Sequence, residues 1–345
     1  MRRPVTALLT VLLSAALGAC SSSDAPEPVA SSGGEAVVIV SGLATQTPFT
    51  TTTAACTQGQ SAGNTASALR DGLIAAGHQV FTAPAQSGPG QVTDTSGVGS
   101  SSSCPNALPA QMTIDTTADI DAGGRRLAGF LRYLAAEYGV TDVHLVGHSM
   151  GGLFSRAATG ELHRGEPRVR SLTALGTPWT GAYPADYGRG DLRLSACAGD
   201  STCRQVLDAY KSTLVATEPA GGAATAISTH AMQGLRGWNE AQGADLAGIP
   251  VTLIAGDHYR KSDGSRTVWP NDAIVALDSA LARGIDGRPL EIRGCLVRPD
   301  VHTIGLAEQA GLPWTSSLTW DPEVITAVEA SVDGQGPDRS QCRTR

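Results

Sequence analysis

The chain has 345 residues, of which 41% are hydrophobic and 17% are charged, and its formal net charge is -7 at pH 7. This length fits one large domain with insertions as well as two small domains, and the apolar content is enough to build a core. Because the balance is acidic and no basic run occurs, the composition excludes the electrostatic footprint of a nucleic-acid-binding protein.

The N-terminal residues predict an export signal with a lipid anchor. Two arginines, at positions 2 and 3, precede an apolar stretch over residues 5–17, which is too short to span a bilayer. The stretch ends in Leu17-Gly18-Ala19-Cys20, which resembles the bacterial lipobox. In that signal the peptide is cut before the cysteine, and the thiol carries a diacylglycerol. We therefore expect a signal peptide over residues 1–19 and lipidation of Cys20; the alternative is an ordinary secretory signal with an unrelated cysteine.

A flexible tether over residues 20–35, rich in Ser, Pro, Gly and Ala, precedes a folded domain over residues 36–345. Within the domain, strands and helices alternate, which predicts an α/β fold with a mainly parallel sheet and helices on both faces. The predicted strands are residues 36–40, 79–82, 141–146, 171–175, 251–255 and 290–297. The predicted helices are residues 66–76, 120–138, 153–158 and 322–332.

Six cysteines remain when Cys20 is set aside, and an even number in an exported chain predicts disulfides. Sequence alone does not fix the pairing, but Cys197 and Cys203 are close enough to close a small loop. The simplest remaining pairs are Cys56 with Cys104 and Cys295 with Cys342. No cysteine or histidine spacing is typical of a structural zinc site, so we expect no metal and no cofactor.

The run Gly147-His148-Ser149-Met150-Gly151 has the pattern Gly-x-Ser-x-Gly between a predicted strand and a predicted helix. In this context the serine stands on a sharp, strained turn that the two flanking glycines permit. The backbone N–H of Met150 then lies in the first helical turn, where it can donate to an oxyanion. A chance Gly/Ser turn is the other interpretation, in a chain with 41 glycines, but the flanking elements favour a nucleophile.

With these features the chain resembles the α/β-hydrolases, and within them the bacterial lipases and esterases. Besides the serine turn, which Gly152 extends to a lipase-like Gly-His-Ser-Met-Gly-Gly, four segments carry the resemblance. They are Ser41-Gly42-Leu43, Gly176-Thr177-Pro178-Trp179, Asn271-Asp272-Ala273-Ile274-Val275 and His302-Thr303-Ile304-Gly305-Leu306. The chain departs from the family at Ser41, where lipases usually have His, so the shape of this loop is left open.

The resemblance implies a catalytic triad in the chain order Ser, acid, His. Ser149 is the expected nucleophile and His302 the expected base, because His302 follows both a candidate acid and a late strand. The other histidines after the serine are His163, His230 and His258. Asp272 is the preferred acid and Asp257, which directly follows a strand and Gly256, is the alternative. Either carboxylate could instead cap a helix.

The resemblance also implies an oxyanion hole made by the backbone N–H groups of Leu43 and Met150. An insertion at about residues 180–248 lies where lipases have a cap or lid, although a surface subdomain without that role is equally compatible with its weak periodicity. Trp179 and Tyr183 are candidate acyl-pocket residues or plain core residues.

The function implied is that of a lipase or carboxylesterase that hydrolyses carboxylic esters of lipids through an acyl-enzyme. We expect a monomer on the extracytoplasmic face of the cell membrane, attached by its lipid anchor, with a lipid or small ester as substrate and no nucleic acid as partner. Two alternatives remain open. An envelope acyltransferase would use the same triad, and a lipoprotein with a retired hydrolase fold would bind a lipid or a partner without catalysis.

Overall fold

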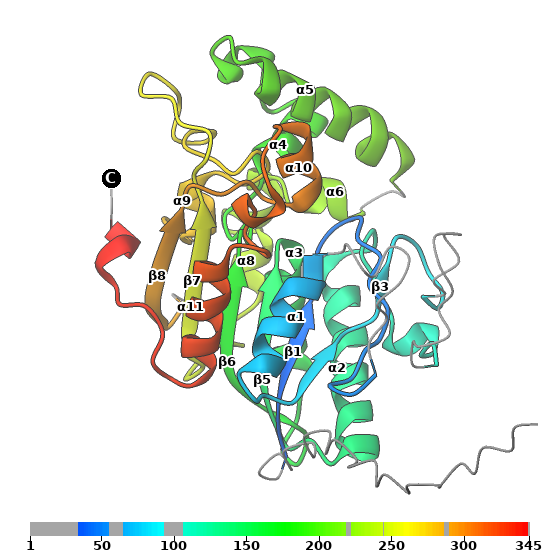
Figure 1. Ribbon diagram of the computed structural model, residues 1–345. Coiled ribbons are helices and arrows are strands. Elements are labelled where there is room, and N and C mark those ends of the chain that lie inside the picture. The colour runs from blue at the N-terminus through cyan, green and yellow to red at the C-terminus, as the bar shows by residue number, and fades with distance from the viewer. Residues whose placement is uncertain are drawn as a thin grey trace, which may run out of the picture. The chain divides into compact units, whose positions relative to one another are not determined.

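A six-stranded sheet with the order β2-β1-β5-β6-β7-β8 forms the centre of the computed structural model, and each neighbouring pair of strands is parallel (Figure 1). The structure describes residues 34–54, 65–92, 106–218, 222–243, 245–285 and 290–343. The strands are β1 (Glu35–Val40), β2 (Val80–Thr82), β5 (Asp142–His148), β6 (Arg168–Leu175), β7 (Val251–Gly256) and β8 (Ile292–Arg298). A separate pair is formed by β3 (Ala85–Gln86) and β4 (Ile114–Asp115). The expected signal peptide, Cys20, Cys56 and Cys104 lie outside the described residues.

Helices cover both faces of the sheet, as the alternating pattern predicts. The longer helices are α1 (Thr65–Ala75), α2 (Ile120–Tyr138), α3 (Met150–Glu161) and α11 (Pro322–Val332). Along β1, Val38 and Val40 pack into the core that contains α2 and α3, whereas Val37 and Ile39 pack against α1 and α11 (Figure 1). Because successive strand residues point to opposite faces, one apolar run serves two cores.

The predicted helices at 120–138 and 322–332 are confirmed, because both carry clear end signals. Asp119 accepts the N–H of Ala122 at the start of α2, and Gly139 ends it with a φ of 66°. The α3 helix differs: it begins at Met150, three residues before its predicted start, because the helix starts directly after the serine turn.

The insertion is helical, although its sequence shows weak periodicity. It contains α4 (Tyr183–Arg189), α5 (Ser201–Ala209), α6 (Ala223–Ala226), α7 (Thr229–Met232) and α8 (Trp238–Ala241). Helices of four residues complete little more than one turn, so they produce no readable apolar stripe. The remaining short helices of the domain are α9 (Leu277–Ala280) and α10 (Ile304–Gln309). Figure 1 shows α4, α6 and α10 near the carboxyl ends of the strands. None of the helices in the described ranges is long and apolar enough to span a membrane.

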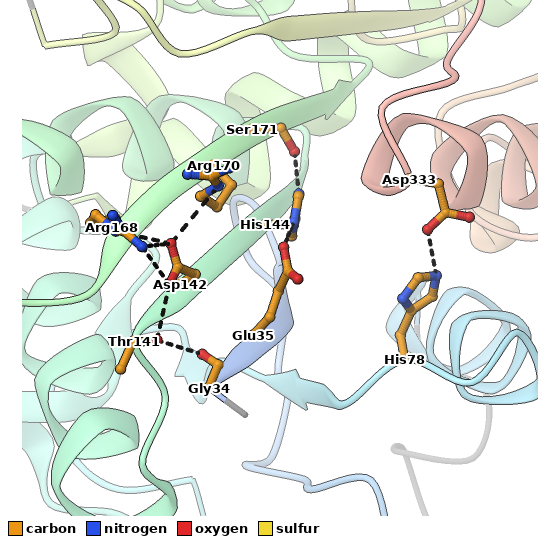
Figure 2. A network of polar contacts seen from close by, with 10 residues as sticks. All are labelled: Gly34, Glu35, His78, Thr141, Asp142, His144, Arg168, Arg170, Ser171 and Asp333. Atoms are coloured by element: carbon orange, nitrogen blue, oxygen red, sulfur yellow. Dashed lines mark hydrogen bonds and ion pairs between the residues drawn. The ribbon is translucent and has the colours of Figure 1, made fainter. Parts of the chain in front are cut away.

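Polar side chains tie the amino ends of the central strands together (Figure 2). His144 on β5 lies between Glu35 on β1 and Ser171 on β6, with 2.7 Å from Nε2 to Oε1 of Glu35 and 2.7 Å from Nδ1 to Oγ of Ser171. Beside them, Asp142 accepts two hydrogen bonds of 3.0 Å from the guanidinium of Arg168. These contacts give the buried His144 hydrogen-bond partners and link the amino ends of β1, β5 and β6.

Two of the expected disulfides are confirmed. Cys197 pairs with Cys203 across 6 residues, and Cys295 pairs with Cys342 across 47 residues. The second bridge fastens the C-terminal segment to β8, where the N–H of Cys295 also donates to the carbonyl of Asp338 at 2.9 Å. Because a bridge that closes a longer loop restricts the unfolded chain more, this one contributes the larger stabilisation, about 4 kcal/mol in the chain-entropy treatment.

A buried carboxyl group lies on the loop that leaves β8. Asp300 is 3% exposed, and its Oδ2 is buried without a hydrogen-bond partner among the described residues. The nearby Asp321 is paired with Arg298, 2.7 Å from Nε to Oδ2. Burial, and after it the negative charge of Asp321, raises the pKa of Asp300 to about 8. Near neutral pH the Asp300 carboxyl is therefore mostly protonated.

This raised pKa predicts a pH-dependent stability. Because the folded-state pKa of Asp300 lies above the value of 3.8 for an ordinary Asp, its contribution to stability is full below about pH 4 and is lost as the pH rises through 8. We expect Asp300→Asn, which cannot ionise, to raise the melting temperature at pH 9 by about 2 °C or more and to change it little at pH 4. Thermal unfolding from pH 4 to pH 9 measures this. An equal difference at every pH would contradict it, and Asp263→Asn at an exposed position serves as the control.

Candidate functional site

Ser149 lies on a strained turn between β5 and α3, with φ 57° and ψ -131°. The turn requires glycine on both sides. A Cβ at Gly151 would lie 2.0 Å from the carbonyl oxygen of Val40, and a Cβ at Gly147 would lie 2.5 Å from the N of Gly152. Side chains at these positions would force β1, β5 and α3 apart. Positive-φ strain of this kind costs about 1–3 kcal/mol and persists where the surrounding packing enforces it.

The loop after β1 crosses directly over the start of α3. A Cβ at Gly42 would lie 2.6 Å from the Cβ of Ser149 and 2.9 Å from the backbone N of Met150. Leu43 follows Gly42, so the two expected oxyanion donors belong to segments in contact with each other. Ser41, which stands where lipases usually have His, is 1% exposed, and its Oγ lies 2.8 Å from Oγ1 of Thr47. The hydrogen bond between the Ser41 and Thr47 hydroxyls links the two ends of this loop.

The structure brings His302 and Asp272 together. The Nδ1 of His302 lies 2.7 Å from Oδ2 of Asp272, and the backbone N–H of His302 donates to the Asp272 carbonyl at 2.8 Å. Asp272 is fully buried, and its Oδ1 accepts the N–H groups of Ile274 at 3.0 Å and Val275 at 2.7 Å. The contact with Asp272 occupies Nδ1 and fixes the ring, which leaves Nε2 as the nitrogen available to a hydroxyl.

His302 also lies beside the serine turn. Its ring centroid is 4.6 Å from that of His148, the residue before Ser149. Gly176 packs against the other side, where a Cβ would lie 2.9 Å from Nδ1 of His302. Leu175, the residue before Gly176, accepts the backbone N–H of Ser149 at 2.8 Å. The Gly176 segment therefore contacts both the serine turn and the imidazole.

The alternative residues lie elsewhere. Asp257, 8% exposed, is engaged by Arg260, with 2.7 Å from NH2 to Oδ1. The Nδ1 of His258 lies 3.2 Å from the carbonyl oxygen of Pro299. His163 and His230 are exposed. The local ion pair gives Asp257 a structural partner, and within the described residues none of the three histidines is hydrogen-bonded to a carboxylate in the way that His302 is.

A second set of Ser, His and carboxylate occurs at the amino ends of the inner strands, where Ser171, His144 and Glu35 meet (Figure 2). Its serine lies inside β6 rather than on a turn. The N–H that follows it, on Leu172, donates to the carbonyl of Pro250 at 3.0 Å. Because that donor is already used, Ser171 lacks the neighbouring backbone N–H that Ser149 has in Met150.

The hydrogen-bond partners that support this site have no signal in the sequence, although Trp179 and Tyr183 are themselves among the expected acyl-pocket or core residues. The hydroxyl of Tyr183 donates to the carbonyl of Ala273 at 2.5 Å and so holds the Asp272 turn. Trp179 is fully buried, and its carbonyl accepts from Asn239 of α8 at 2.7 Å. Asn239 in turn accepts from the buried Arg156 of α3 at 2.8 Å. Both aromatic residues are core residues that join the insertion to the site, a role for which the sequence carries no distinct signal.

A cavity of about 340 Å³ opens beside the loop that follows β1. Its walls come from Leu43, Pro89, Asp115, Leu214, Glu218 and Ala224. Leu214, Glu218 and Ala224 belong to the insertion, so the insertion forms one wall of this cavity, and Leu43 is the expected site residue that lines it. Among the residues that the structure describes, no group of three or more His, Cys, Asp or Glu side chains could hold a metal ion.

Comparisons with known proteins agree with this fold. A family model described as alpha/beta hydrolase fold matches residues 92–196, which contain the Ser149 turn. Triacylglycerol lipases from Pseudarthrobacter phenanthrenivorans and Burkholderia plantarii are each 34% identical over 79 residues, or 23% of this chain. The matched part covers only 24% and 21% of those relatives.

Among solved structures, the mature lipase BlEst2 of Bacillus licheniformis is 14% identical, with 88% of this chain and 92% of that chain covered and a TM-score of 0.46. A likeness at this level says nothing about substrate. The parallel sheet, the strand–Ser149–helix turn and the family match show that the chain has an α/β-hydrolase fold.

Proposed function

We propose that this chain is a serine hydrolase that cleaves carboxylic esters of lipids or small alcohols, as a lipase or carboxylesterase does. The observation that carries the proposal is the 2.7 Å contact between His302 and the buried Asp272, beside the strained turn of Ser149. A serine hydroxyl is a weak nucleophile at neutral pH, and an oriented imidazole in reach of it is what activates it.

In the acylation step, Oγ of Ser149 attacks the ester carbonyl carbon while its proton moves to Nε2 of His302. The resulting imidazolium is stabilised by Asp272, which keeps its negative charge. Collapse of the tetrahedral intermediate breaks the bond to the alcohol oxygen, and His302 returns the proton to the departing alcohol. The product is an ester between Ser149 and the acyl group.

The negative charge that develops on the carbonyl oxygen needs preorganised donors. We assign this role to the backbone N–H groups of Met150 and Leu43, whose segments are in contact through Gly42. The N–H of Met150 lies in the first turn of α3, where no helical carbonyl precedes it, and the helix dipole adds to its effect.

In the deacylation step, water takes the place of the alcohol. His302 removes a proton from the water, the hydroxide oxygen attacks the acyl carbon, and Oγ of Ser149 leaves with the proton from the imidazolium. The 340 Å³ cavity lined by Leu43, Leu214 and Ala224 is at the small end of ligand pockets, and we propose that it accepts one part of the ester.

The nucleophile assignment predicts selective labelling by a fluorophosphonate probe, which reacts with activated serines. We expect the wild type to be labelled and Ser149→Ala to remain unlabelled, because the hydroxyl that attacks phosphorus is gone. Ser171→Ala is the matched control, since Ser171 also contacts an imidazole, and it should be labelled like the wild type. Persistent labelling of Ser149→Ala would contradict the assignment.

The acid and base assignments predict a large, non-additive loss of rate. His302→Ala and Asp272→Asn should each lower kcat by about a thousandfold or more, and the double variant should lose little beyond the more damaging single change. Asp257→Asn removes a carboxylate of similar burial that pairs with Arg260 and should lower kcat by less than about tenfold. The assignment of the acid is wrong if Asp257→Asn is the crippling change and Asp272→Asn is mild.

We further propose that the mature protein is held at the outer face of a membrane by a lipid on Cys20, on the strength of the lipobox-like residues 17–20. Wild type expressed in bacteria should then partition into the detergent phase, and Cys20→Ala should stay aqueous or be mis-processed. Ser21→Ala, one residue beyond the cleavage signal, is the control that should partition like the wild type. An aqueous wild type would refute the anchor.

A further inference from the structure

The histidine inside the Gly-x-Ser-x-Gly run makes contacts that the proposed reaction has not used. His148 is 2% exposed at the end of β5, directly before Ser149. Its Nε2 lies 2.9 Å from the backbone carbonyl oxygen of His302, a residue 154 positions away in the chain. The two imidazole rings are tilted by 41° with centroids 4.6 Å apart. His148, the residue before Ser149, is therefore hydrogen-bonded to the backbone of His302.

The hydrogen bond fixes the proton on the His148 ring. A carbonyl oxygen can only accept, so Nε2 must carry the hydrogen. Nδ1 of His148 is then an acceptor, and it is buried without a hydrogen-bond partner among the described residues. A side chain serving only as core filler would not need this arrangement, because an apolar residue of the same size avoids the unsatisfied nitrogen. The contact with His302 is the one polar function that the ring performs.

The His148 ring is neutral, which is compatible with its contact with His302. Burial, together with the neighbouring His302, lowers the pKa of His148 to about 3, so the ring stays neutral at the pH where esters are hydrolysed enzymatically. A cation 4.6 Å from His302 would oppose formation of the imidazolium during turnover. The neutral ring places only its N–H dipole against the His302 backbone.

His302 is thus held at three points. Asp272 engages its Nδ1 at 2.7 Å and its backbone N–H at 2.8 Å, and His148 engages its carbonyl at 2.9 Å. The Asp272 contacts orient the ring relative to the β7–α9 loop. Of these three hydrogen bonds, the one from His148 links the His302 backbone to the residue next to Ser149, so it bears directly on the separation between Ser149 and the imidazole.

We propose that His148 is a positioning residue, whose Nε2–H holds the His302 carbonyl and thereby keeps the imidazole in register with Ser149. The proposal rests on the proposed function, because it concerns the same serine and histidine. On this proposal, the residue at the second position of the Gly-x-Ser-x-Gly run affects the geometry of the reacting groups. A misplacement of about 1 Å between reacting groups can cost about a hundredfold in rate.

The test compares two substitutions at position 148 with p-nitrophenyl butyrate as substrate. His148→Leu keeps the volume but removes the donor, and we expect kcat to fall about ten- to a hundredfold with KM changed less than about threefold. His148→Gln places an amide N–H near the position of Nε2, and we expect it to recover kcat to within about fivefold of the wild type. A merely structural role would not separate the two variants in this way.

The melting temperature of His148→Leu and a control variant at His144 distinguish a loss of positioning from a loss of folding. His148→Leu leaves the His302 carbonyl without its donor but also removes the unpaired Nδ1, so its melting temperature should lie within about 3 °C of the wild type. His144 is a buried histidine near the other end of the same strand, β5, and His144→Gln should change kcat less than about twofold. Fluorophosphonate labelling of wild-type Ser149 must be present throughout, since its absence would overturn the proposed function itself. With labelling intact, an unchanged kcat in His148→Leu, or equal losses in His148→Leu and His148→Gln, overturns the positioning role alone.

Discussion

A single buried carboxylate determines how the candidate site is built. Asp272 is fully excluded from water, and an isolated charge in that position would be prohibitively costly. Its two oxygens are instead satisfied by the N–H groups of Ile274 and Val275 and by the imidazole of His302. Because these donors come from its own turn and from the loop after β8, the carboxylate joins the loops that leave the adjacent parallel strands β7 and β8.

The other constraints act around this contact. The strained turn at Ser149 exists because Gly147 and Gly151 allow β1, β5 and α3 to approach more closely than any side chain permits. Tyr183 of α4 holds the Asp272 turn through the carbonyl of Ala273, and so the insertion contributes to the geometry of the acid. The site is therefore supported by the central sheet from below and by the insertion from one side, which is how preorganised donors are kept in place.

Much of this arrangement could be predicted from the sequence, for reasons that differ between residues. Ser149 is recognisable because the nucleophile turn needs glycine at fixed spacing between a strand and a helix, a purely local requirement. The α2 helix is equally readable, because its cap, stripe and terminal Gly139 all lie within twenty residues. The parallel direction of the strands follows from the alternation of strands and helices.

The choice of the acid and the role of His148 could not be predicted, because both depend on contacts between residues that are far apart in the sequence. Asp257 and Asp272 both follow β7, and the difference between them lies in their partners. Asp257 pairs with Arg260 three residues away, whereas Asp272 meets His302 thirty residues away. The role that we infer for His148 depends on a hydrogen bond across 154 positions and on one ring tautomer, neither of which leaves a sequence pattern. The short helices of the insertion were missed because four residues are too few to show a period.

The central claim is that turnover passes through an acyl group on Ser149, and trapping that group tests it most directly. Mixing the protein rapidly with excess p-nitrophenyl butyrate, quenching in acid and mapping the peptides by mass spectrometry would locate the acyl group. We expect a burst of p-nitrophenol of about one equivalent when deacylation is the slower step, and a butyryl mass on the peptide that contains Ser149. Hydrolysis of the ester with the butyryl group on another residue, such as Ser171, would contradict it.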